Sequence, residues 1–283
     1  MMSKYLITAF LFTIIWGCTS SPFEGKNVTP SVRKISGKVR LSTNEDPQDV
    51  FIWFEGFDMN THPDENGNFE FSIPPPSAQN SSGGLTGVFN IYFYIANFSL
   101  VVKPIVFLNG DIAVEQTEIN QQGQFLQEML MFENLKIHTE VDPNSVDKND
   151  SSVPVTINVI LQAVKDSVDV LFPRRTGGLS APIFFRNLET GDVTILQTSV
   201  PDKKAKDTLR VPPSPTLRQL TTEINVGRFP PGKYEIIPYI LILNPEVPEG
   251  LFQSLGTDGQ PFGMDYLIIP FKRSREVFEI LAN

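Results

Sequence analysis

Short stretches in which apolar and polar residues alternate dominate the first third of the chain. Alternation with a period of two is typical of strands that bury one face. It predicts strands at residues 35–41 (ISGKVRL) and 69–73 (FEFSI), whereas residues 49–55 (DVFIWFE) are apolar on both faces and predict a central strand. Asn66-Gly67 predicts a hairpin turn, because both residue types tolerate a positive φ. Two further strands are expected at residues 88–95 and 100–108.

The second half of the chain also consists of short apolar runs separated by turn residues. Residues 189–192 (ETGD) predict a hairpin turn, and Pro231-Gly232-Lys233-Tyr234 precedes an apolar strand, as is common in immunoglobulin-like sandwiches. Residues 244–263 predict a long loop rich in Pro and Gly. About seven strands are expected, the number typical of such a sandwich. They lie at residues 153–163, 167–172, 183–188, 193–198, 217–226, 233–243 and 265–271.

The region between the halves is less regular. Residues 124–133 (QFLQEMLMFE) fit a short helix or a strand, and residues 135–141 alternate like a strand. The polar run 142–150 predicts a linker. With 23 Pro and 19 Gly between short β-rich runs, the composition favours sandwiches over helices. We therefore predict an all-β fold with two tandem β-sandwich domains, at residues 34–143 and 151–283.

The first domain also carries a specific resemblance. The runs ISGKV, DVFIWFEG and THPDENGNFEFSIPP resemble a carboxypeptidase regulatory-like domain, over about residues 34–112. The resemblance implies a small transthyretin-like β-sandwich without catalytic residues, followed here by an extension to residue 143. The Pro-Gly-x-Tyr that usually follows the motif is replaced by a longer loop, PPPSAQNSSGGLTG.

The N-terminus has the pattern of a secretory signal. Lys4 supplies a positive charge, and residues 6–16 form an apolar stretch too short to span a bilayer, which takes about 20 residues. The stretch ends in Gly17-Cys18, with Ile15 two residues before the glycine, and Cys18 is the only cysteine. An ordinary signal peptide with a chance cysteine, or a weak membrane anchor, are the alternatives to a lipid attachment site.

Residues 15–18 resemble the lipobox of bacterial lipoproteins, from which Trp16 departs because a small or aliphatic residue is usual there. The resemblance implies cleavage of residues 1–17 as a signal peptide and acylation of Cys18, for example with palmitate. Thr19 stands where Asp retains such proteins at the inner membrane, which favours the outer membrane of the bacterial cell envelope. Residues 18–33 have no apolar period and predict a flexible tether.

Charge and cysteine content narrow the possible partners. Lys and Arg number 23 against 32 Asp and Glu, which gives a formal charge of −9. An acidic surface argues against nucleic acid and against docking on anionic lipid by charge alone. A single cysteine permits no internal disulfide, so stability depends on burial, for which 22 Phe and a hydrophobic content of 41% are adequate.

Motifs for catalysis or cofactor binding are not recognisable in the sequence. His62-x-x-Glu65 has the spacing of two zinc ligands, but it falls in the hairpin of the regulatory-like motif, and His138 is the only other histidine. Asp64, Asn66 and Asn68 do not match the spacing of an EF-hand loop. We therefore expect no catalytic residues, no metal site, no cofactor and no enzymatic activity.

Four aromatic residues form the candidate binding face. Alternation in residues 49–55 and 88–95 points them away from the first core. An apolar face of this kind needs a cover, either residues 113–141 or the second domain, or else serves as an exposed platform for sugar rings or a partner protein. These residues are Phe51, Trp53, Tyr92 and Tyr94.

Two functions are compatible with these features. The first is a non-enzymatic, membrane-anchored binding or adhesion module for a polysaccharide or an envelope protein. The second is a structural or assembly accessory of an outer-membrane complex. An enzyme of unrecognised type is a third possibility.

Overall fold

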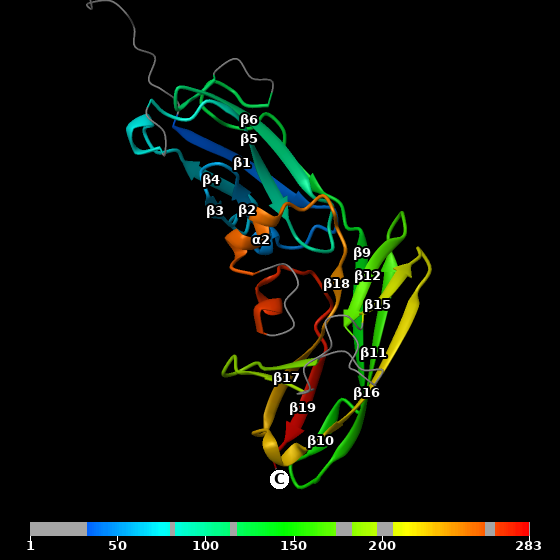
Figure 1. The fold of residues 1–283 in the computed structure, drawn as a ribbon. Helices are drawn as coiled ribbons and strands as arrows, with labels where there is room; N and C mark the ends of the chain where they lie inside the picture. The colour runs from blue at the N-terminus through cyan, green and yellow to red at the C-terminus, as the bar shows by residue number, and fades with distance from the viewer. Residues whose placement is uncertain are drawn as a thin grey trace, which may run out of the picture. The chain divides into compact units, whose positions relative to one another are not determined.

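The computed structural model describes residues 33–79, 83–113, 118–173, 183–196, 206–257 and 264–282, all of them in the compact unit Val32–Asn283. The signal peptide, Cys18 and the tether up to residue 32 lie outside the described residues. Most of the described elements are strands, arranged in several sheets with few helices (Figure 1). The prediction of an all-β fold is confirmed.

Two sheets form the first half of this unit (Figure 1). The larger has the order β3-β2-β5-β6-β7, and the smaller has the order β4-β1-β8, with β8 parallel to β1. The larger comprises β3 (Met59–Thr61), β2 (Phe51–Phe54), β5 (Gly87–Tyr94), β6 (Val101–Leu108) and β7 (Asp111–Ile112). The smaller comprises β4 (Asn68–Ser72), β1 (Lys34–Leu41) and β8 (Met129–Met131), and the short 3-10 helices η1 (Pro47–Asp49) and η2 (Pro76–Ala78) lie in the connections.

The core of the first half contains side chains from both of these sheets. Ile35 and Phe71 from the smaller sheet share one buried cluster with Ile52, Phe54 and Phe93 from the larger. The alternating stretch 69–73 contributes its apolar positions to this cluster, because Phe69, Phe71 and Ile73 are buried. Burial of one face per strand therefore accounts for this half of the fold.

The turn at Asn66-Gly67 differs from the expected hairpin. It connects β3 in one sheet to β4 in the other, and β4 pairs with β1. Gly67 has a φ of +86°, and a Cβ there would lie 2.1 Å from the carbonyl oxygen of Val39. The turn therefore requires glycine, as the sequence indicated, although it connects two different sheets and is not a hairpin turn.

Three sheets form the second half. Their orders are β16-β11-β9, β15-β12-β18 and β10-β19-β17-β13-β14. Buried residues from all three form one cluster that includes Ile157, Val170, Phe185 and Phe278. The first two comprise β16 (Thr216–Ile224), β11 (Val153–Ala163), β9 (Leu135–Asp142), β15 (Lys206–Val211), β12 (Val168–Pro173) and β18 (Leu241–Ile242). The third comprises β10 (Ser145–Asp147), β19 (Val277–Leu281), β17 (Gly232–Pro238), β13 (Ile183–Asn187) and β14 (Val193–Ile195), and the 3-10 helix η3 (Val226–Arg228) precedes β17.

The polar run 142–150 is a connection within this half and does not behave as a free linker. β9, expected at the end of the first domain, pairs along its whole length with β11. Within the run, β10 pairs with β19, and Lys148 Nζ donates to the carbonyl oxygens of Val226 and Phe229 at 3.2 and 2.5 Å. The division into two tandem domains stays a prediction. The structure shows only that β9 pairs with a strand of the second half.

Two expectations near the C-terminus are wrong. The stretch 265–271, which was expected to be a strand, contains the 3-10 helix η4 (Met264–Ile268). Within it, the Tyr266 hydroxyl donates to the Ile240 carbonyl at 2.9 Å and accepts from the Ile240 N–H at 3.1 Å. The expected loop at 244–263 contains helix α2 (Glu249–Leu255), which ends at Gly256 in the left-handed region. In the part of the chain that the structure describes, no helix is long and apolar enough to cross a membrane.

Candidate functional site

The structure brings the four predicted aromatic residues together on one face of the larger first-half sheet. In the register of β2 and β5, Phe51 pairs with Tyr94 and Trp53 pairs with Tyr92. The rings of Trp53 and Tyr92 stack with their centroids 5.4 Å apart. This face belongs to a third buried cluster, separate from the cores of the two halves.

This aromatic face is covered, so it offers no exposed platform. Its four side chains are only 3–9% exposed. α2 lies against it, with the ring of Phe252 5.8 Å from that of Tyr94, and a Cβ on Gly250 would lie 2.8 Å from the Trp53 ring. The cover comes from the second half of the chain, from described residues between 237 and 271 together with Leu171 and Phe184, and not from the segment 113–141. We call the four aromatic residues and this cover the aromatic junction.

Burial determines the electrostatics of the aromatic junction. Loss of water around the Tyr94 hydroxyl raises its pKa well above the usual range, because the phenolate is the form that needs solvation. Burial of the Tyr92 hydroxyl also raises its pKa. Trp53 Nε1 is buried without a hydrogen-bond partner in the structure. The junction is thus an apolar packing surface.

The residues of the His-x-x-Glu motif lie at and beside the turn before β4. His62 Nδ1 lies 3.2 Å from the carbonyl oxygen of Gln48. The Asp64 carboxylate accepts hydrogen bonds from the backbone N–H groups of Asn66 and Asn68, and the Asn68 side chain and the turn N–H groups lower its pKa. Among the described residues no cluster of three His, Cys, Asp or Glu side chains could hold a metal ion.

His138 takes part in a second polar contact, at the surface. Its Nδ1 lies 2.7 Å from Ser274 Oγ, and its Nε2 lies 3.4 Å from Glu140 Oε1. A serine, a histidine and a carboxylate can form a nucleophilic triad. Here both the histidine and the glutamate are about half exposed, and the Thr139 N–H also donates to Ser274 Oγ at 3.4 Å. The contact fixes the C-terminal segment against β9.

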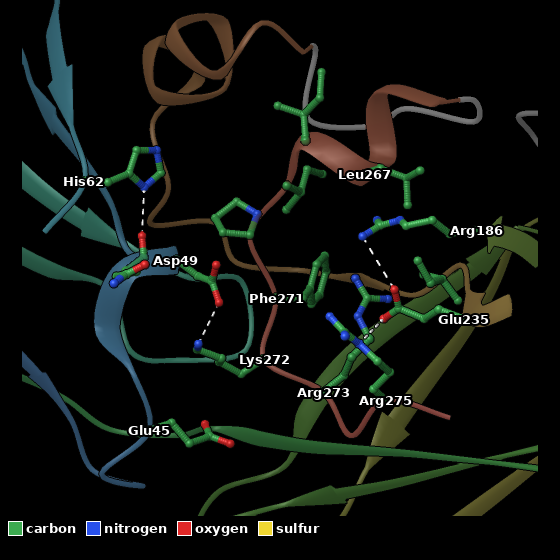
Figure 2. Close-up of a pocket in the computed structure, with 15 residues that line it drawn as sticks. Glu45, Asp49, His62, Arg186, Glu235, Leu267, Phe271, Lys272, Arg273 and Arg275 are labelled. Atoms are coloured by element: carbon green, nitrogen blue, oxygen red, sulfur yellow. Dashed lines mark hydrogen bonds and ion pairs between the residues drawn. The ribbon is translucent and has the colours of Figure 1, made fainter. Parts of the chain in front are cut away.

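Several charged side chains line a groove of about 560 Å³ (Figure 2). Its apolar floor, as we name the apolar residues of the lining, consists of Ile237, Leu267, Ile268, Ile269, Pro270 and Phe271, of which Ile237 and Ile269 are buried. Figure 2 shows Phe271 between two charged groups, one around Glu235 and the other around Asp49. The groove therefore combines an apolar floor with charges at both ends.

Three arginines and a buried glutamate form one end, which we call the arginine wall. Arg186 on β13 and Glu235 on β17 are cross-strand partners, with Arg186 Nη1 3.5 Å from Glu235 Oε2. Arg275 Nε lies 3.6 Å from Glu235 Oε1. The Glu235 side chain is only 9% exposed, so it needs these cations to offset its desolvation. Its Oε2 makes no hydrogen bond, and the contact with Arg186 is purely ionic.

Arg273 completes the arginine wall without a carboxylate partner among the described residues. Its guanidinium lies 4.9 Å from the centroid of the Phe271 ring and 5.9 Å from that of Tyr266. Contacts of this kind hold a cation over the negative face of an aromatic ring. Within the described part of the chain, the N–H groups at the edge of the guanidinium have no hydrogen-bond acceptor.

The other end of the groove is held by a buried asparagine. Lys272 Nζ pairs with Asp49 Oδ2 at 2.6 Å. The Asn97 side chain, which is fully buried, donates to the carbonyl oxygen of Lys272 at 2.8 Å and accepts from its N–H at 2.9 Å. Asn97 thereby fixes the backbone from which Phe271, Arg273 and Arg275 project.

Sequence reasoning did not identify the arginine wall. The run Lys272-Arg273-Ser274-Arg275 is a visible concentration of positive charge. Its partner Glu235 is distant in the sequence and is brought to Arg186 only by the pairing of β13 with β17. The other adjacent pair of basic residues, Arg174 and Arg175, lies outside the described residues.

Comparisons with known proteins give a limited result. No family model matches the chain, and no curated protein matches it. Over 74% of its length the chain is similar to the full-length major pilin SpaD from Corynebacterium diphtheriae, with a TM-score of 0.33 and 9% identity, covering 60% of that chain. Over 74% it is also similar to the Bacillus anthracis TIE protein, with a TM-score of 0.25 and 9% identity, covering 45% of that chain. Both scores are too low to support an argument about function.

Proposed function

We propose that this protein is a non-enzymatic binding module of the bacterial envelope, whose ligand occupies the groove of Figure 2. The observation that supports the proposal is the arginine wall, in which three guanidiniums stand against one carboxylate beside an apolar floor. Arginine is favoured at binding sites because its planar group offers several N–H donors at fixed angles.

The side chains that line the groove are suited to binding and not to proton transfer. Arginine stays protonated at any pH at which proteins fold, so it cannot act as a general base. Glu235 already pairs with two arginines, and Asp49 already pairs with Lys272. His62 Nδ1 is directed to the Gln48 carbonyl. The charges around Glu235 and Asp49 are thus paired with one another, and the guanidinium of Arg273 is left to contact a ligand.

A binding array tests this function without assuming the chemistry of the ligand. Full-length protein would be applied to immobilised envelope polysaccharides, peptides and membrane-protein extracts, beside a double variant Arg273→Gln, Arg275→Gln. Arg210→Gln, an exposed arginine on β15, is the matched control for loss of charge. A ligand held by the native protein and the control but lost by the double variant supports the groove. If every retained component binds all three proteins equally, the groove is not the binding site.

The attachment to the membrane is a separate part of the proposal and is supported by the sequence pattern Ile15, Gly17, Cys18. Acylation of Cys18 would hold the protein at the membrane, in our proposal the outer one, through more than one chain, since a single chain binds only marginally. Cys18→Ser followed by cell fractionation tests this step. A variant that stays in the membrane fraction as fully as the native protein would contradict lipid anchoring.

An accessory role in an envelope complex is the second candidate. It is favoured by a cavity of about 760 Å³ that is lined in part by Phe132 and Val164. These side chains are 57% and 46% exposed, and burial raises the pKa of the neighbouring Glu133. A photo-crosslinking residue at position 132 should capture one defined envelope protein, whereas the same residue at position 126, which is also exposed, should not. Equal labelling from both positions would contradict the accessory role.

A further inference from the structure

We infer that the groove binds an acidic segment of a partner polypeptide, an inference that rests on the proposed binding function. Carboxylates of this segment would pair with Arg273 and Arg275, and an apolar side chain beside them would lie against the wall formed by Leu267, Ile268 and Phe271. The inference follows from charge, from the fixed positions of the arginines and from the apolar wall.

The arginine wall carries an excess of positive charge on an acidic protein. Arg186 and Arg275 share the carboxylate of Glu235, and Arg273 has no carboxylate partner among the described residues. Lys272 pairs with Asp49 across the groove, so the lining, which also contains Glu45, keeps a net positive charge that lies at the arginine wall. The formal charge of the whole chain is −9. At physiological ionic strength charges are screened beyond about 8 Å, so a ligand in the groove experiences mainly the local arginines. The local field therefore attracts anions.

The arginines are held in place before any ligand arrives. Glu235 contacts Arg186 and Arg275 from a buried position, and the Phe271 ring supports Arg273. Asn97 fixes the backbone of the same segment. A ligand carboxylate then meets guanidiniums that have already lost part of their side-chain freedom, which reduces the entropic cost of binding. Pairs of arginine with carboxylate are also among the stronger hydrogen-bonded contacts in proteins.

The apolar wall favours a polypeptide over an acidic polysaccharide. Ile268 is 45% exposed at the groove, and Leu267 and Phe271 are partly exposed beside it. A peptide can supply a leucine or valine next to its carboxylates, whereas a sugar polymer cannot. Sugars bind aromatic rings by stacking on a free face, and one face of the Phe271 ring is taken by Arg273. The groove thus fits mixed acidic and apolar side chains.

Fluorescence anisotropy with synthetic peptides tests the inference. The probe is a labelled peptide of four glutamates, one leucine and four glutamates, and its matched control replaces every glutamate by glutamine. Full-length protein in detergent should bind the glutamate peptide at least about tenfold more tightly than the glutamine peptide. The double variant Arg273→Gln, Arg275→Gln should lose about tenfold or more, and Arg210→Gln should bind as the native protein does.

Several results would overturn the inference. One is equal affinity for the two peptides, and another is unchanged binding by the double variant at an unchanged melting temperature. Binding of polygalacturonate with no binding of the glutamate peptide would replace the polypeptide by an acidic polysaccharide. If no acidic probe binds but the array gives a neutral or cationic ligand that depends on Arg273, the inference fails and the binding function stands. If the array also gives no groove-dependent ligand, both fail.

Discussion

The aromatic junction and the arginine wall are neighbours along the C-terminal part of the chain, which contributes to both, and they have opposite properties. In the junction, residues 237–271 cover Trp53 and its neighbours until each is less than a tenth exposed. At the wall, the residues that follow direct arginines into an open groove, where Arg275 is 64% exposed. Covering apolar surface lowers the free energy of the folded state, whereas covering a charge removes its hydration and raises that free energy. The junction should therefore govern stability and the wall should govern binding.

The largest expected effect is at the centre of the aromatic junction. Trp53→Ala should lower the free energy of unfolding by about 3–5 kcal/mol, because a large buried side chain leaves a cavity. Val88→Ala, at an exposed position on the neighbouring β5, should change it by less than about 0.5 kcal/mol. Urea unfolding measures both. If Trp53→Ala leaves stability unchanged, the junction is not packed as described.

A smaller loss of stability is expected when Asn97 is replaced, because its buried side chain holds the backbone of Lys272 beside the groove. Asn97→Asp keeps the acceptor but removes the two hydrogen bonds that Nδ2 donates to the carbonyl oxygens of Leu135 and Lys272. It should cost about 1–3 kcal/mol, because buried carbonyl groups lose their donor. It should also weaken ligand binding, because it releases the backbone of the arginine wall.

The exposed Asn60 is the control for this change. Asn60→Asp loses one contact, with Ser254, and should leave stability nearly unaltered. Equal unfolding curves for the two variants would show that Asn97 does not hold the segment in place.

The pH dependence of stability gives a third test of the junction. Desolvation raises the pKa of Tyr94 above 10.0, the usual value for a tyrosine, so above that pH the folded state retains a proton that the unfolded state loses. Stability should therefore fall as the pH rises above 10.0, with a slope of up to about 1.4 kcal/mol per pH unit for this group. Tyr94→Phe should reduce the slope, which chemical denaturation at several alkaline pH values measures. An unchanged slope would contradict the burial of this hydroxyl.

The smallest effect on stability is expected at the arginine wall itself. Arg275→Gln removes an ion pair whose arginine is 64% exposed, and Arg186 still offsets the charge of the buried Glu235, so the loss should be about 1 kcal/mol or less. Arg273→Gln removes a cation–π contact of about 0.5–1 kcal/mol. Thermal unfolding should place both variants within a few degrees of the native protein. A large loss of stability in either would mean that the wall is a structural element.

The two regions also differ in how far the sequence predicted them. Alternation alone placed Phe51, Trp53, Tyr92 and Tyr94 on one face, because side-chain direction in a strand is a local property. Whether that face is covered depends on α2, which the Pro- and Gly-rich stretch 244–263 concealed. The arginine wall could not be predicted, because Arg186, Glu235 and Arg275 meet only through strand register. The pairing of β9 with β11 is likewise a long-range contact that no local pattern in residues 135–141 indicates.

A charge exchange at Arg273 tests most directly whether the arginine wall is the binding surface. The measurement is the affinity of the native protein and of Arg273→Glu for two peptides, the glutamate–leucine probe and its lysine counterpart. The account predicts that Arg273→Glu weakens the glutamate peptide by about tenfold or more and strengthens the lysine peptide, since the sign of the local charge is reversed. Affinities for both peptides that do not change, in a variant that still unfolds at the native temperature, would contradict it.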